Sequence, residues 1–232
     1  MLYVFLAVAP AIAIILYIYY RDKQEKEPIS LLIKAFLYGL LSILPAAYLE
    51  MRYVSHSSHV LAVFYSTFFV IAGAEEGSKY LFMYWAAYRK KAFNEPFDGI
   101  VYCVMVGMGF AAGENLMYVL QSDNPMNTAI MRMLTAVPAH ATFAVIMGYY
   151  TGLAKFSEHK SIQYTVMAIG GAMLFHGFYD FCLMQQEMSY IALGAFVSLV
   201  VAIRLSWKAL RQQSETSKEF IENGGVLNDE EN

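Results

Sequence analysis

The chain alternates between long apolar stretches and short polar connections. Seven stretches reach the roughly 20 residues that a helix needs to cross the apolar core of a bilayer. Because they are apolar on all sides, their length, rather than a helical periodicity, predicts helices. The pattern therefore indicates an all-α fold, a polytopic membrane helix bundle with about seven transmembrane helices. The expected spans are residues 2–20, 31–49, 60–87, 98–120, 128–153, 163–184 and 189–207.

The basic residues support that count and orient the bundle. Thirteen Lys and Arg residues lie at the first, third and fifth connections or after the seventh span, whereas only Arg52 and Arg132 lie at the even connections. Lys and Arg concentrate on the cytoplasmic side of a membrane. We therefore expect the N-terminus outside and the C-terminus in the cytosol. Residues 1–211 should form one transmembrane domain, with its active-site helices at about 60–184, and residues 212–232 a polar, disordered cytosolic tail.

Composition narrows the class of protein. Of 232 residues, 58% are hydrophobic and 15% are charged, against about 25% charged in a soluble domain. The first apolar run is followed directly by Arg21, without a cleavage site, which predicts an uncleaved membrane helix. The sequence has no cluster of basic and aromatic residues of the kind that would indicate a nucleic-acid partner. The bilayer is the expected environment, and the two cysteines, both in apolar segments, predict packing rather than a disulfide.

Two adjacent carboxylates and a lysine interrupt the third apolar stretch. Glu75, Glu76 and Lys79 lie near the middle of residues 60–87. Each such charge costs about 2.5–3.5 kcal/mol at the centre of a bilayer unless it faces protein or water. Glu75 and Lys79, four residues apart, can pair on one helix face, so Glu76 must find a partner on a neighbouring helix.

Three further spans carry polar residues that would be costly in lipid. These are Glu114 with Asn115, then His140, and then His176 with Asp180 one turn later. If lipid-exposed, the five charged side chains would together cost about 15 kcal/mol. We therefore expect the whole set to face a wet cleft that opens outward between the third and sixth helices. Pro138, just before His140, predicts a kink in the fifth helix.

This set of side chains suits the activation of water. A buried Glu can act as a general base, while another acid or a His protonates the leaving amine, which together describe hydrolysis of a peptide bond. The residues alone favour no cofactor, although zinc held by His140, His176 and a Glu stays open, without the spacing of a known zinc motif. Two other functions also remain open: a proton-coupled transporter or channel, and a non-catalytic membrane sensor or immunity protein.

Taken in order, these residues resemble the PrsW family of bacterial intramembrane proteases, which is distantly related to the CAAX prenyl endopeptidases and Abi (CPBP) proteins. The resemblance rests on five motifs. In chain order they are Glu75-Glu76-x-x-Lys79, Phe97-Asp98-Gly99-x-x-Tyr102, Gly107-x-Gly109-Phe110-Ala111-x-x-Glu114-Asn115, His140 with Gly148-Tyr149, and His176-Gly-x-x-Asp180.

The resemblance implies an enzyme of the bacterial cell membrane. PrsW proteases make the first, extracytoplasmic-side cut in a single-pass anti-sigma factor, RsiW, during envelope stress, which leads to release of an extracytoplasmic-function sigma factor. By analogy, Glu75 activates water with Glu76 as its partner. Glu114 and His140 complete the water or proton site, His176 and Asp180 assist the oxyanion or leaving group, and Lys79 and Asn115 support them.

Overall fold

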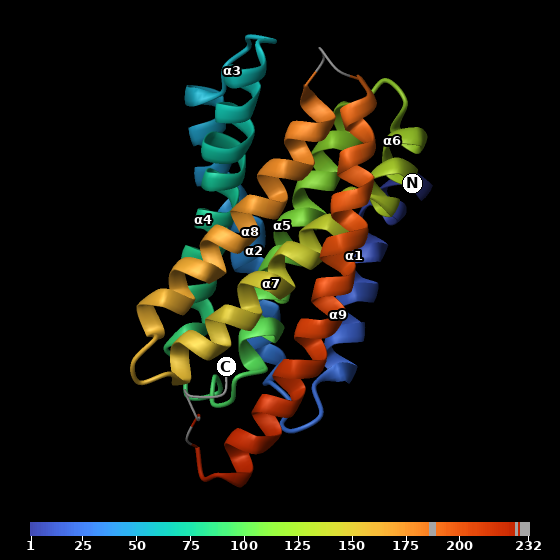
Figure 1. Ribbon diagram of the computed structural model, residues 1–232. Helices are drawn as coiled ribbons and strands as arrows, with labels where there is room; N and C mark the ends of the chain where they lie inside the picture. Colours follow the sequence, from blue (N-terminus) through green and yellow to red (C-terminus); the bar gives the residue numbers. More distant parts are fainter. Residues whose placement is uncertain (186–188, 226, 228–232) are drawn as a thin grey trace.

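The computed structural model describes residues 1–185, 189–225 and 227, and within them the secondary structure is entirely helical. Among these residues, seven helical segments are long and apolar enough to cross a membrane. They run roughly along one axis in a single bundle (Figure 1). The first two are α1 (Leu2–Arg21) and α2 (Ile29–Tyr53). The predicted all-α membrane bundle is confirmed.

The third span contains two π-helical segments. It begins as α3 (Val60–Tyr65), passes through a π-helical segment, η1 (Ser66–Ile71), and continues as α4 (Ala72–Met83) and a second π-helical segment, η2 (Tyr84–Tyr88). π-helical turns are rare and occur often at functional sites. Here one of them directly precedes the helix that carries Glu75 and Glu76.

The fifth span is two helices rather than one kinked helix. After α5 (Asp98–Gln121), a short α6 (Pro125–Leu134) ends at Thr135, whose backbone is not helical, and α7 (Ala136–Phe156) follows. Pro138 lies in the first turn of α7, where its missing N–H has no intrahelical partner to lose. The expected kink at Pro138 is therefore wrong, because the break comes three residues earlier.

The last two spans are α8 (Ser161–Met184) and α9 (Ala192–Glu222), with a 3₁₀ turn, η3 (Ser189–Ile191), before α9. The tail expected from residue 212 needs correction, since α9 stays helical as far as Glu222. Gln213, Ser217 and Phe220 of this extension are buried and pack under the loops at the cytosolic end. Their burial explains why the helix continues. Residues 226 and 228–232 lie outside the described residues.

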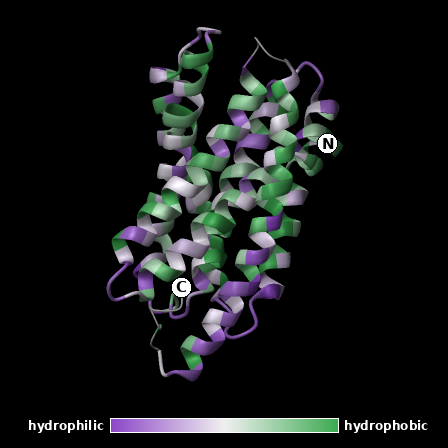
Figure 2. Cartoon of the chain, in the orientation of Figure 1, coloured by the Kyte–Doolittle hydropathy of each residue, from purple (hydrophilic) through white to green (hydrophobic). Residues whose placement is uncertain are grey.

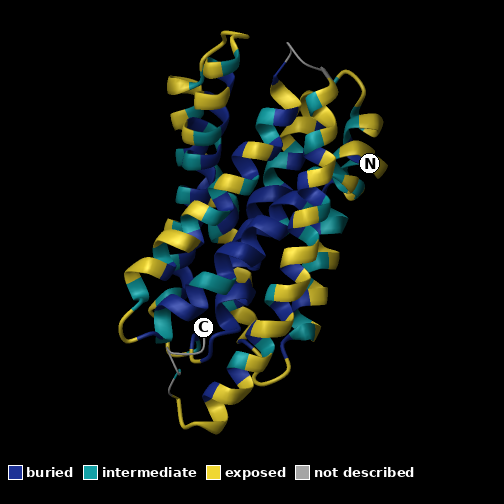
Figure 3. Ribbon diagram, in the orientation of Figure 1, coloured by how far each residue is buried: buried dark blue, intermediate teal, exposed yellow. Residues whose placement is uncertain are grey.

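Helix α5 is the centre of the bundle, and α1, α2 and α7 pack around it (Figure 3). The residues at these close helix crossings are glycines, which have no Cβ atom. A Cβ on Gly109 would lie 2.1 Å from the Phe36 carbonyl oxygen of α2, and one on Gly148 of α7 would lie 2.5 Å from the Ile100 Cα. Small residues let membrane helices approach in this way, so the glycines hold α5 rigidly between its neighbours.

The outside of the bundle is apolar along its length and polar at its ends (Figure 2). Large side chains such as Leu44, Phe69 and Leu193 are more than half exposed, as expected for helices that face lipid tails. Polar side chains inside the bundle are therefore the exception that requires a chemical explanation.

Candidate active site

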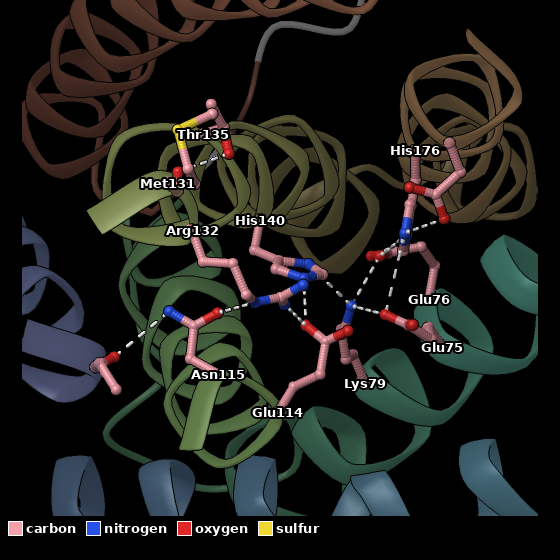
Figure 4. Close-up of polar contacts among 12 residues, drawn as sticks. Glu75, Glu76, Lys79, Glu114, Asn115, Met131, Arg132, Thr135, His140 and His176 are labelled. Carbon is pink, nitrogen blue, oxygen red and sulfur yellow. Dashed lines mark hydrogen bonds and ion pairs between the residues drawn. The ribbon is translucent and has the colours of Figure 1, made fainter. Parts of the chain in front are cut away.

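Lys79 joins the two adjacent carboxylates of α4. Its Nζ atom lies 2.9 Å from Glu75 Oε2 and 2.8 Å from Glu76 Oε1 (Figure 4). All three side chains are buried. The i,i+3 and i,i+4 spacings place both carboxylates within reach of one ammonium, so the prediction that Glu76 pairs only with another helix was incomplete.

His176 of α8 supplies the expected second partner for Glu76. Its Nδ1 lies 2.8 Å from Glu76 Oε1, and its Nε2 lies 3.2 Å from Asp180 Oδ2 and 3.9 Å from Glu75 Oε2. The ring also stacks on Phe143 of α7. With a carboxylate at each nitrogen and an aromatic ring against its face, the imidazole is fixed in orientation.

His140 of α7 links Lys79 to Glu114 of α5. Its Nδ1 lies 3.3 Å from Lys79 Nζ, and its Nε2 lies 2.9 Å from Glu114 Oε2. An ammonium can only donate, so Nδ1 accepts from Lys79 and Nε2–H donates to Glu114. The contacts thus define one tautomer and one continuous network that crosses three helices.

Arg132 of α6 completes the network on the outer side. Its Nη2 lies 2.8 Å from Glu114 Oε2, and its Nε donates to Asn115 Oδ1 at 2.7 Å. Asn115 in turn donates to the Ala7 carbonyl of α1 at 3.3 Å. The break at Thr135 allows α6 to fold back and bring this arginine to Glu114, so a residue counted as a loop charge is part of the site.

A cavity of about 330 Å³ opens beside the network. Its wall includes Glu75, Glu114, His140, His176 and Asp180, whereas Glu76 and Lys79 do not line it. Tyr118, Thr135 and Met184, near the outer ends of their helices, also line it. An adjoining pocket of about 170 Å³ shares Glu75 and Glu114 and adds Gln121. The expected outward-opening cleft is present, with Glu75 at its wall and Glu76 behind.

Glu50 of α2 is a further acid at this cavity that sequence analysis missed. It lines both pockets together with Glu75 and Glu114. In the sequence it stands near the end of an apolar run beside Arg52, where charges normally face water at the membrane surface. The position alone therefore carried no signal for a role in the site.

The buried donors also suit a metal ion. One ligand atom each from Glu75, Glu76, His140 and His176 lies within 4.8 Å of the others. Two imidazoles and carboxylate oxygens form an acceptable set for Zn²⁺. However, the Lys79 ammonium lies among three of these four donors, so it must withdraw before a cation can take its place. The donor types fit a metal, and Lys79 competes for it.

The structure joins Glu75, Glu76, Glu114, His140, His176 and Asp180, the six candidate catalytic residues, in one network with Lys79 and Asn115. Asp98, from the second motif, is not part of it. It begins α5 at the opposite, cytosolic end of the bundle.

Known proteins resemble this chain over most of its length. Residues 27–220 match the family model described as "PrsW family intramembrane metalloprotease". The chain is 37% identical over 206 residues to a protein named Protease PrsW from Geobacillus kaustophilus, covering 88% of each chain. It is 33% identical over 178 residues to Protease PrsW from Bacillus subtilis, covering 76% of this chain and 80% of the relative. No solved structure matches. With a family match over most of its length and relatives of this identity, the chain belongs to the PrsW family of intramembrane proteases.

Proposed function

We propose that this multi-pass bacterial membrane peptidase cuts a single-pass anti-sigma factor near the outer face of the membrane, with Glu75 activating the attacking water. One observation carries the assignment: Glu75 lines the outward-opening cavity, whereas Glu76 is buried behind it between Lys79 and His176. A general base must contact the water that it activates, whereas the carboxylate that assists the base need not. The anti-sigma factor is proposed from the family resemblance.

In this reaction, Glu75 takes a proton from water as the water oxygen attacks the carbonyl carbon of the scissile peptide bond. The carbon–nitrogen bond then breaks and the leaving nitrogen receives a proton. Asp180 and His176, which also line the cavity, stabilise the developing oxyanion or orient the leaving group. Glu114 and His140 hold the water or pass its proton, and the buried Lys79 and Glu76 keep Glu75 in position.

A metal-dependent variant uses the same side chains. If a zinc ion is bound, His140, His176 and Glu76 would hold it, and it would lower the pKa of bound water and polarise the substrate carbonyl. Glu75 would keep its role as base at the cavity wall. Lys79 would turn away from Glu76 and His140 in that state, because its ammonium and the metal require the same donors.

The test is cleavage of a single-pass anti-sigma factor by purified protein in lipid nanodiscs, with and without a chelator. Glu75→Gln keeps the shape of the side chain and removes the base. We expect it to lower the cleavage rate by at least about 100-fold, in the range that general-base catalysis contributes. Glu158→Gln, an exposed acid at the opposite end, is the matched control and should cut at the wild-type rate.

Each arm of the experiment has its own meaning. Glu75→Gln protein that cuts at the wild-type rate would refute the assignment of the base. Wild-type protein that cuts other single-pass proteins but not the anti-sigma factor would refute the substrate and leave the peptidase intact. Activity lost with chelator and restored by Zn²⁺ would favour the metal-dependent variant over water activated by Glu75 alone.

A further inference from the structure

Glu50 of α2 differs from the other acids at the active-site cavity in its contacts. Four acidic side chains line the cavity of about 330 Å³: Glu50, Glu75, Glu114 and Asp180. Three of them have a basic side chain within 3.2 Å: Lys79 contacts Glu75, Arg132 contacts Glu114, and His176 contacts Asp180. In the described part of the chain, no hydrogen bond or ion pair joins Glu50 to another residue. Glu50 is therefore free to bind a group that enters the cavity.

The charges around Glu50 do not favour a further negative charge at this wall. Four charged groups of neighbouring helices act on it electrostatically: Glu75 and Lys79 of α4, Glu114 of α5 and His176 of α8. The ammonium and the imidazole make their short contacts with other carboxylates. A half-buried acid that faces two carboxylates, without a cation of its own, is disfavoured in its charged form. Glu50 is thus the acid that can carry a proton into the reaction.

Glu50 also faces the same space as the proposed base. It lines the cavity of about 330 Å³ and the adjoining pocket of about 170 Å³, and Glu75 lines both of them as well. Both volumes are large enough to hold water molecules. The two acids come from different helices, α2 and α4, so a peptide bond in this space would have a carboxyl group on each of two sides. Hydrolysis of an amide requires this arrangement, because one group takes a proton from water and another gives one to the leaving nitrogen.

We propose that Glu50 is the general acid of the peptidase and gives its proton to the nitrogen of the scissile bond. The inference rests on the proposed function, in which Glu75 is the base. The water oxygen bonds to the carbonyl carbon and one water proton passes to Glu75. When the carbon–nitrogen bond breaks, its electron pair stays on nitrogen and takes the proton of Glu50. The products are a carboxylic acid and an amine.

The shared pockets also provide a way to restore both acids. After the bond has broken, Glu75 holds one proton too many and Glu50 holds one too few. Because both side chains line the same two water-sized spaces, water between them can carry the proton from Glu75 to Glu50. The enzyme then returns to its starting state without a group from outside the cavity.

The experiment compares two forms of one transmembrane substrate that differ in a single bond. The substrate is a single-pass segment that the wild-type protein cuts in lipid nanodiscs, with the cut mapped by mass spectrometry. The first form has the natural peptide bond at that position, and the second has a thioester. A thiol has a pKa of about 8.5, so a thiolate can leave without a proton, whereas an amine nitrogen cannot leave as an anion. The thioester therefore removes the need for a general acid but keeps the need for activated water.

Glu50→Gln should lower the rate on the peptide bond by at least about 100-fold, in the range that general-acid catalysis contributes. It should cut the thioester at close to the wild-type rate. Glu75→Gln should slow both reactions, because both begin with attack by water. Arg52→Gln is the matched control, since it removes an exposed charge from the same helix at a spacing that does not face Glu50, and it should cut both substrates at the wild-type rate.

Two results would overturn the proposal. Glu50→Gln protein that cuts the peptide bond at the wild-type rate would show that another group gives the proton. Equal losses on both substrates, with an unchanged unfolding midpoint, would show that Glu50 binds or positions the substrate instead. If Glu50→Gln does not fold, Glu50→Ala decides the question on the same two substrates.

Failure of the proposed function would give a different pattern. Glu75→Gln protein that cuts both substrates at the wild-type rate would refute the base, whereas a loss confined to the peptide bond in Glu50→Gln would still identify the proton donor. An anti-sigma factor that is not cut would refute that substrate alone, because the comparison can use any single-pass segment that the wild-type protein cuts.

Discussion

Exchange of Lys79 for methionine tests whether this ammonium holds the active site together. The change keeps most of the length of the side chain and removes its charge. At an effective dielectric constant of 20, each contact, at 2.9 Å to Glu75 and 2.8 Å to Glu76, contributes about 6 kcal/mol of gross Coulomb attraction. Much of that attraction is offset by the cost of desolvating the three charges.

The net effect is the penalty of leaving two adjacent carboxylates buried without a cation. Removing one partner of a buried ion pair costs about 3–5 kcal/mol. For a chain of this length, that corresponds to a fall in the unfolding midpoint of roughly 6–20 °C. Zn²⁺ should restore part of the loss, because methionine leaves free the three donors, of the four in the candidate metal set, that the ammonium otherwise contacts.

Thermal unfolding in detergent, followed by far-ultraviolet circular dichroism, measures the effect with and without Zn²⁺. Lys218→Met is the matched control, since this lysine is exposed and its ion pair with Glu222 is at 3.7 Å. It should leave the midpoint unchanged. A Lys79→Met midpoint equal to that of the control would refute the argument that the ammonium neutralises the two carboxylates.

Three other predictions concern packing, the outer edge of the site and pH. Gly148→Ala should cost about 1–3 kcal/mol in unfolding free energy, because its Cβ meets the α5 backbone, whereas Gly170→Ala, with open space around it, should not destabilise. Arg132→Lys should lower kcat/KM about tenfold in the cleavage assay, since an ammonium cannot make the same two-pronged contact, and an unchanged value would exclude that role. Because burial raises the pKa values of Asp22 and Glu95, the folded state binds protons more tightly than the unfolded state. The stability of the protein in chelator should therefore fall as the pH rises from about 4 to 8. An unfolding midpoint that stays constant over this range would contradict the prediction.

The spans and the candidate residues of the site could be predicted because lipid imposes strong constraints. Every apolar run had to be a helix, and charges such as Glu75 and His176 inside those runs had to meet. The arginine at position 132 could not be predicted in the same way. Its role depends on the backbone at Thr135, which ends α6 inside an apolar stretch without a glycine or proline at that position.

The burial of acids at the cytosolic end could not be predicted for a related reason. Asp22, Glu27 and Glu95 stand in polar connections, where a charge normally costs nothing. They are buried nonetheless, and the α9 extension past residue 211 contacts the loop that carries Glu95, where Gln213 donates to the Pro96 carbonyl. Burial of a loop residue depends on which distant segment packs over it, and local sequence carries no signal for that.

The π-helical segment η1 affects the direction in which the candidate catalytic acids point much more than their depth in the membrane. One residue more or less in a helix rotates everything beyond it by about 100° but moves it only 1.5 Å along the axis, whereas a full turn restores the direction and moves it about 5.4 Å. Deleting a single residue from Ser66–Ile71 would therefore leave Glu75 at its level in the membrane and point it at the wrong helix. The number of residues in this segment thus determines which neighbouring helix Glu75 faces, and relatives that lengthen or shorten it should do so by whole turns.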